Sequence, residues 1–141
     1  MLVHEGRVLL IRRGKEPLFG RWVVPGGTVE RGETIEAALI REMKEETDLV
    51  VKPVELLAVF DQIQRDSGGE VAYHYVILDY LCEYVSGALR AGSDALEAAF
   101  ARPEDLLAFD LPSKALEVVQ DALARTSARS LALAAGPRYT P

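Results

Sequence analysis

The chain has 141 residues, 49% hydrophobic and 27% charged, which fits one globular domain with a buried core. Its formal net charge of -6 argues against general nucleic-acid binding. No apolar run is long enough to span a membrane, no signal-peptide pattern opens the chain, and a lone cysteine, Cys82, rules out an internal disulfide. We therefore expect a cytoplasmic protein with neither a membrane nor a nucleic acid as partner.

Short β-strands joined by glycine turns are predicted at the start of the chain. Apolar residues 8–11 follow a turn at residues 4–6, which indicates a hairpin, and residues 21–24 read as another short strand. That strand stops at Gly26 and Gly27, which mark a turn because neither favours a regular element.

An amphipathic helix is predicted from Ile35 to about Glu46. Thr34 suits its N-cap, and the residues that follow are mostly good helix formers without Gly or Pro. Ile35, Leu39 and Met43 recur every fourth residue, so we expect them to form the apolar stripe of the helix.

Three carboxylates of this helix share one patch. Glu42, Glu45 and Glu46 stand at positions i, i+3 and i+4, so their charges repel and a cation would relieve them. Oxygen ligands favour hard cations such as Mg²⁺ or Mn²⁺, and a carboxylate-bound Mg²⁺ cluster is suited to hydrolysing a diphosphate bridge. The same residues also fit a solvated helix face on which Arg41 pairs only with Glu45.

The rest of the chain predicts a long hairpin, a further strand and a closing helix. The expected elements are strands at 50–60 and 71–84 around a turn at 66–69, a strand at 96–100, a helical turn at 103–106 and a helix at 113–125. Pro53 is expected to break the first of these strands. We expect a single domain over residues 1–126 and a C-terminal tail of uncertain structure over residues 127–141.

The stretch from Gly27 to Leu49 reads GTVERGETIEAALIREMKEETDL. It resembles the signature box of the Nudix hydrolases, G-x5-E-x7-R-E-U-x-E-E-x-G-U, in which U is apolar. Its matching residues are Gly27, Glu33, Arg41, Glu42, Met43, Glu45, Glu46 and Leu49. The family's late glycine is Asp48 here, which predicts a left-handed and slightly strained helix end. The resemblance implies an α/β (mixed α+β) fold in which a mixed β-sheet is sandwiched between helices.

The resemblance implies a metal site built by the box. Glu42, Glu45 and Glu46 would bind Mg²⁺, with Mn²⁺ as the alternative, and the carbonyl of Gly26 would complete the coordination. Glu45 or Glu46 is expected to hold the ion nearest the attacked phosphorus, and Glu45 is expected to belong to the catalytic centre as well.

Four further residues are expected to act in catalysis or around it. The resemblance implies that Arg41 orients the glutamates and that Glu33 braces the preceding loop. A general base is expected outside the box, at Asp94 or Glu97. Asp94 is equally well explained as a turn residue after a glycine, and Glu97 as a solvent-facing strand residue.

We expect substrate phosphates to approach Arg13, Arg21 and Gly27, because the arginines flank the glycine turn at strand ends. Residues 12–33 and 73–84 look most like the ADP-ribose and nucleotide-sugar branch. This implies hydrolysis of a nucleoside diphosphate derivative to a nucleoside monophosphate and a phosphorylated partner. The alternatives are a (d)NTP pyrophosphohydrolase that releases pyrophosphate, and a ligand-sensing Nudix-like domain without turnover. Related enzymes are often dimers, so a homodimer is compatible with the resemblance.

Overall fold

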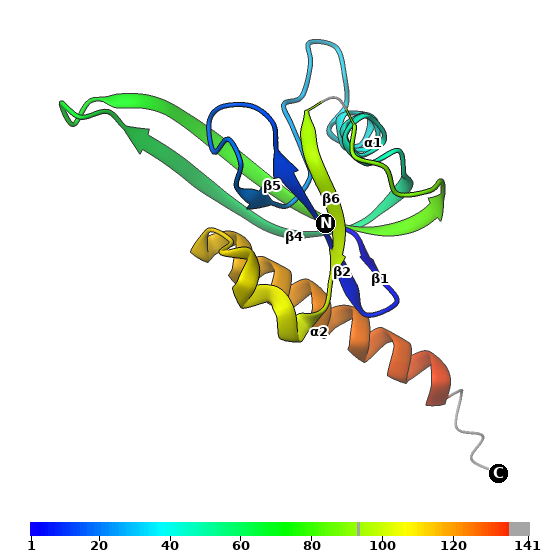
Figure 1. Ribbon diagram of the computed structural model, residues 1–141. Helices are drawn as coiled ribbons and strands as arrows, with labels where there is room; N and C mark the ends of the chain where they lie inside the picture. The colour runs from blue at the N-terminus through cyan, green and yellow to red at the C-terminus, as the bar shows by residue number, and fades with distance from the viewer. Residues whose placement is uncertain (93, 136–141) are drawn as a thin grey trace.

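The computed structural model describes residues 1–92 and 94–135 (Figure 1). Its elements, in chain order, are β1 Val3–His4, β2 Arg7–Arg13, β3 Trp22–Val23, α1 Ile35–Thr47, β4 Val50–Arg65, β5 Val71–Ser86, β6 Ala95–Ala101, the 3-10 helix η1 Pro103–Phe109 and α2 Ser113–Ala135. None of the helices in these described residues has the length and hydropathy needed to cross a membrane.

The strands form two antiparallel sheets that are joined near the N-terminus of the chain. β2 pairs with β1, β3 and β6, while β4 and β5 pair with each other as the predicted long hairpin. A parallel bridge between Leu2 and Cys82 connects the two sheets, which makes the combined sheet mixed. β3 and β5 are not paired to each other in the described structure, so the backbone hydrogen bonding of the combined sheet is interrupted between these two strands.

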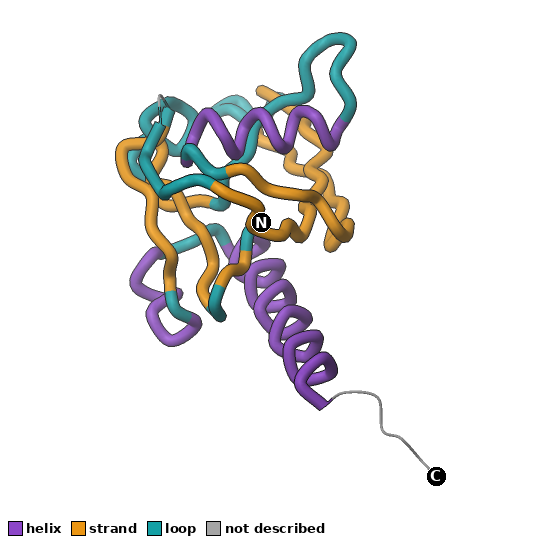
Figure 2. The backbone as a smooth tube through the Cα atoms, turned by 90° about the vertical axis from the view of Figure 1, so that its right-hand side faces the viewer, coloured by secondary structure: helices purple, strands orange, loops and turns teal. Residues whose placement is uncertain are grey.

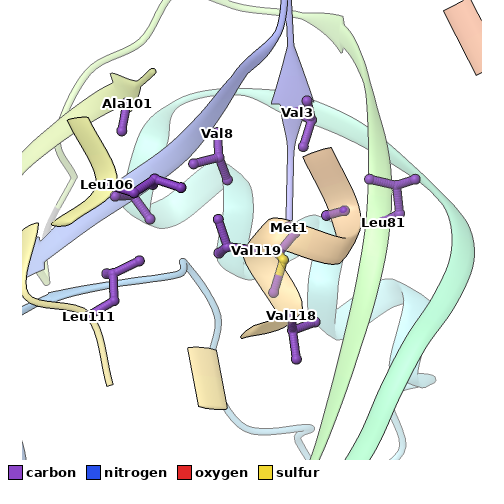
Figure 3. Packing of buried hydrophobic residues seen from close by; sticks show 11 residues of the cluster. Met1, Val3, Val8, Leu81, Ala101, Leu106, Leu111, Val118 and Val119 are labelled. Carbon is purple, nitrogen blue, oxygen red and sulfur yellow. The ribbon is translucent and has the colours of Figure 1, made fainter. Parts of the chain in front are cut away.

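Two apolar cores lie on opposite faces of this sheet, because consecutive side chains of a strand point to opposite sides. Val8 clusters with Val118 and Val119 of α2, as Figure 3 shows, whereas Leu9 clusters with Met43 of α1. The strands therefore lie between the two helices, which Figure 2 shows from the side. The expected α+β fold, with sheet between helices, is confirmed.

Two predicted boundaries are wrong. β4 continues through Pro53 to Arg65, because the strand is at an edge of the sheet and its pairing is irregular between Pro53 and Glu55. α2 extends to Ala135 instead of ending near residue 125, since the added segment consists largely of Ala, Leu and Arg, which favour helix. Residues 136–141 of the predicted tail lie outside the described residues.

Candidate active site

α1 begins at a side-chain cap, Thr34, and ends at a left-handed residue, Asp48, as the sequence predicts. The Thr34 hydroxyl accepts a hydrogen bond from the backbone N–H of Ala37 at 3.1 Å. At the other end Asp48 adopts the left-handed conformation, with φ 60° and ψ 12°, and its carboxylate pairs with Lys44. The helix that carries the acidic residues is thus defined at both termini.

The buried face of α1 is rotated from the expected stripe. Met43 is buried and Leu39 is partly buried, but Ile35 is 42% exposed, so it does not belong to the core. Glu46 and Thr47 are buried instead. This rotation brings one of the three predicted metal ligands into the interior.

Arg41 connects the glycine turn to the acidic patch. Its guanidinium donates to both oxygens of Glu33, from Nε at 2.8 Å and from Nη2 at 3.0 Å. Nη1 donates to Glu42 at 2.7 Å and to Glu45 at 3.4 Å, and Nη2 donates to the Thr28 carbonyl at 3.1 Å. One guanidinium therefore holds three carboxylates and the loop in a single arrangement.

Glu33 fastens the loop that precedes α1. Besides the bidentate contact with Arg41, its carboxylate accepts a hydrogen bond from the backbone N–H of Glu30 at 3.0 Å. The Arg41 hydrogen bonds, followed by that backbone N–H, lower the pKa of Glu33 to about 2. The side chain is consequently ionised over the whole physiological range.

Glu46 is the buried member of the acidic patch. It is 5% exposed, and one carboxylate oxygen accepts a hydrogen bond from the backbone N–H of Gly26 at 2.9 Å. Burial raises the pKa of Glu46 to about 7, opposed by the Gly26 hydrogen bond and reinforced by the charge of Glu42. The glycine turn and the carboxylate are therefore in direct contact.

Gly27 packs closely against the carboxylate of Glu42. A Cβ atom placed on Gly27 would lie 2.2 Å from Oε1 of Glu42, much closer than two such atoms can approach. The absence of a side chain lets the Glu42 carboxylate lie against the turn.

A cleft of about 930 Å³ opens beside the acidic patch. Glu42, Gly26, Gly27 and Arg13 line one part of it. Its other walls come from β3, from β5 and from the start of α2, and include Tyr73, Tyr75, Asp79 and Lys114. A smaller cavity of about 200 Å³, between α2 and the hairpin, includes no residue of the acidic patch. The larger cleft is therefore the one at which chemistry at the carboxylates can occur.

Residues 1–122 match the family model of the NUDIX domain. The chain belongs to the Nudix hydrolase family. The resemblance stated from residues 27–49 is thereby confirmed, and those residues are called the Nudix box below.

Known relatives agree with this assignment. The Nudix chain is 42% identical over 112 residues to the ADP-ribose pyrophosphatase of Methanocaldococcus jannaschii, an alignment that covers 78% of this chain and 64% of the relative. It is 34% identical over 94 residues to the 8-oxo-dGDP phosphatase of Mus musculus, covering 67% of this chain and 26% of the relative. The chain thus spans less than two thirds of either protein.

A solved structure matches over nearly its full length. The MutT NUDIX hydrolase of Burkholderia pseudomallei superimposes with a TM-score of 0.66 at 32% identity, over 87% of this chain and 90% of that chain.

The two predicted phosphate-binding arginines are placed differently. Arg13 lines the cleft, and its charge lowers the pKa of Glu46, so it lies near the box. Arg21 instead donates to the backbone carbonyl of Asp110 at 3.0 Å and to its carboxylate at 3.2 Å. Arg21 therefore joins β3 to the end of η1 and is not brought to the Nudix box.

The two candidates for the general base also lie in different places relative to the Nudix box. Glu97 pairs with Arg12 at 2.6 Å and is its neighbour in the β2–β6 register, which places both on the face toward α2. Because α1 covers the other face, Glu97 is turned away from the box. Asp94 pairs with Lys15 at 2.6 Å, and its charge raises the pKa of Glu46, so Asp94 lies closer to the acidic patch.

The donor set of the Nudix box fits a hard divalent cation. Three glutamates, at positions 33, 42 and 45, gather around Arg41, and the charge of Glu42 also acts on Glu46, which leaves unbalanced negative charge. Over residues 1–92 and 94–135, no three acidic, His or Cys side chains already converge as a metal cage. A cation at this position would thus compete with Arg41 for the oxygens of Glu42 and Glu45.

Sequence reasoning missed the contribution of the hairpin to the cleft. The aromatic and acidic residues of β5 were visible in the sequence as an alternating strand. Their placement in the cleft depends on how β5 lies relative to α2, which no local pattern shows.

Proposed function

We propose that this Nudix hydrolase cleaves the diphosphate linkage of a nucleoside diphosphate derivative, either ADP-ribose or a nucleotide sugar. The products would be a nucleoside monophosphate and a phosphorylated partner. The observation that carries the proposal is the acidic patch held by Arg41 at the edge of a cleft of about 930 Å³. The 42% identity to an ADP-ribose pyrophosphatase supports the substrate class.

Mg²⁺, with Mn²⁺ as the alternative, is the cofactor that we propose for the reaction. Glu42, Glu45 and Glu46 would hold it, together with the carbonyl of Gly26. When bound, such a cation shields phosphate charge and makes a bound water more acidic.

The residues of the chain would prepare this site before substrate arrives. Arg41 fixes the carboxylates of Glu42 and Glu45, which reduces the loss of side-chain freedom on binding. Arg13 would contact a phosphate group from the wall of the cleft. Asp94 is better placed than Glu97 to accept a proton from the attacking water, because its charge acts on Glu46.

We also propose that the protein acts in the cytoplasm. Its nucleotide substrates are intracellular compounds, and its one cysteine, Cys82, is a buried free thiol.

A second function is favoured by one observation. The identity to an 8-oxo-dGDP phosphatase suits an enzyme that removes nucleoside di- or triphosphates. Such an enzyme would release phosphate or pyrophosphate in place of a phosphorylated sugar.

Phosphorus NMR of the products distinguishes these functions. With Mg²⁺ present, the proposal expects ADP-ribose or a nucleotide sugar to disappear with the appearance of two phosphate monoesters. Preferential turnover of (d)NTP with release of pyrophosphate would replace the proposal by the (d)NTP alternative. Binding of these compounds without any turnover would indicate a ligand sensor.

A further inference from the structure

One wall of the cleft is formed by a face of the hairpin that carries no box residue. Tyr73, Tyr75 and Asp79 alternate along β5 and therefore point to the same side. Phe60 of β4 shares that side, and the Lys114 ammonium lies 5.8 Å from the centre of its ring. Figure 1 shows the start of α2 beneath the hairpin, which agrees with this contact. All five residues line the cleft.

The aromatic residues of this wall offer flat surfaces. The rings of Tyr73 and Tyr75 are 5.0 Å apart between centroids, and Tyr75 remains 46% exposed. Exposed aromatic faces that line a cleft are suited to stack on a planar ring of a ligand.

Asp79 is a carboxylate without a partner in this setting. Over the described residues its side chain forms neither a hydrogen bond nor an ion pair, although it is half-buried. Burial raises the pKa of Asp79, and the α-amino group of Met1 and Lys114 oppose that rise. Its carboxylate oxygens still reach solvent, because no side-chain N or O atom of the described residues is both buried and without a partner. A ligand that covers these oxygens would have to supply N–H donors in place of water.

The other acidic residue of the hairpin that lines the cleft is different in this respect. Asp61 pairs with the imidazole of His74 at 2.6 Å and points to the opposite side of the hairpin from Phe60. Asp61 is therefore a matched control for Asp79, because it has the same chemistry on the same hairpin.

We propose that Asp79 determines base specificity by accepting a hydrogen bond from the exocyclic amino group of a nucleobase that stacks on Tyr75. This inference rests on the proposed function, since it assumes that the cleft takes a nucleotide. Carboxylates recognise amino groups on base edges because they only accept hydrogen bonds. Hypoxanthine, which carries a carbonyl oxygen where adenine carries the amino group, would face Asp79 with a second acceptor.

The test compares two substrates that differ only in that group. We expect the wild type to prefer ADP-ribose over its inosine counterpart by about tenfold or more in kcat/KM, since the bound hypoxanthine would cover the Asp79 carboxylate without supplying the donor that adenine supplies. Asp79→Ala should bring this ratio near one, mainly through KM. Asp61→Asn should leave the ratio unchanged, and Tyr75→Leu should raise KM for both substrates alike.

The proposal is overturned if Asp79→Ala retains the wild-type ratio or lowers both activities equally. Asp79→Asn, which keeps the shape of the side chain, replaces the alanine variant if that variant does not fold. Isothermal titration calorimetry of AMP and IMP with the wild type and the Asp79 variant measures the same base preference as a ratio of affinities, without catalysis. If the wild type turns over neither ADP-ribose nor any nucleotide sugar, the proposed function fails. Equal changes in AMP and IMP affinity on substitution of Asp79 would refute the role of Asp79 separately.

Discussion

At the scale of single residues, Arg41 organises the Nudix box. Its five donor groups are divided among three carboxylates and one backbone carbonyl, a distribution that lysine cannot reproduce. Glu45 receives the longest of these contacts and is the most exposed of the three carboxylates, with 53% of its side chain accessible. Glu45 is thus the carboxylate most free to turn toward a cation.

We expect Glu45→Gln to lower kcat by about a hundredfold or more while leaving the fold unchanged, because it removes a charge from the proposed metal site at an exposed position. Steady-state kinetics and a thermal melt would measure both effects. Glu36→Gln, in the first turn of the same helix and at a position that the box pattern leaves undefined, should retain normal turnover. Near-normal activity of the Glu45 variant would contradict the site.

At the scale of elements, a loop secures the end of α1 that carries Glu45 and Glu46. The backbone N–H of Gly92 donates to the Glu46 carbonyl at 2.9 Å, and that of Arg90 donates to the Thr47 carbonyl at 3.0 Å. These bonds satisfy carbonyls that the helix itself leaves unpaired. The loop from β5 to β6 therefore helps to position the Nudix box.

Gly92→Ala is expected to destabilise the protein by about 2 kcal/mol or more, because the new Cβ would lie 1.7 Å from the Glu45 carbonyl oxygen. Turnover should fall as well, since the loop or the helix end must move. Urea unfolding followed by circular dichroism measures the first effect. Ala91→Ser, at the exposed neighbouring position, serves as the control. Equal stability of the two variants would show that the loop does not press on α1.

At the scale of the whole molecule, burial of Glu46 couples folding to pH. Its pKa in the folded protein, about 7, is above the ordinary value of 4.5 for a glutamate, so the folded state retains a proton that the unfolded state loses. The free energy of unfolding should therefore decrease as pH rises from about 4.5 to 7 and then stay level, with a total contribution of roughly 3 kcal/mol.

Urea unfolding of chelator-treated protein at several pH values measures this decrease in the free energy of unfolding. Glu46→Gln should remove the contribution, whereas Glu36→Gln should keep it. An unchanged slope in the Glu46 variant would assign the pH dependence to other groups.

The same titration should control metal binding. Mg²⁺ favours the ionised carboxylate, so we expect its affinity to rise as pH passes through about 7, and turnover to be best at alkaline pH. Isothermal titration with Mg²⁺ at pH 6 and pH 8 measures the difference. Equal affinities would place the cation away from Glu46.

The sequence alone determined the features that depend on near neighbours. The caps of α1 at Thr34 and Asp48, the turn before the Nudix box and the grouping of its glutamates all follow from spacings within a few residues. The family followed from the same short stretch, because its chemistry requires those residue types at those distances.

Only the tertiary structure decided which side chains are buried and which distant segments meet. It placed Glu46 in the interior, turned Glu97 to the opposite face of the sheet and brought β5 and the start of α2 to the cleft. These outcomes depend on packing between residues far apart in the chain. Local spacing carries no information about such contacts, because they are established only when the two helices pack on opposite sides of the sheet.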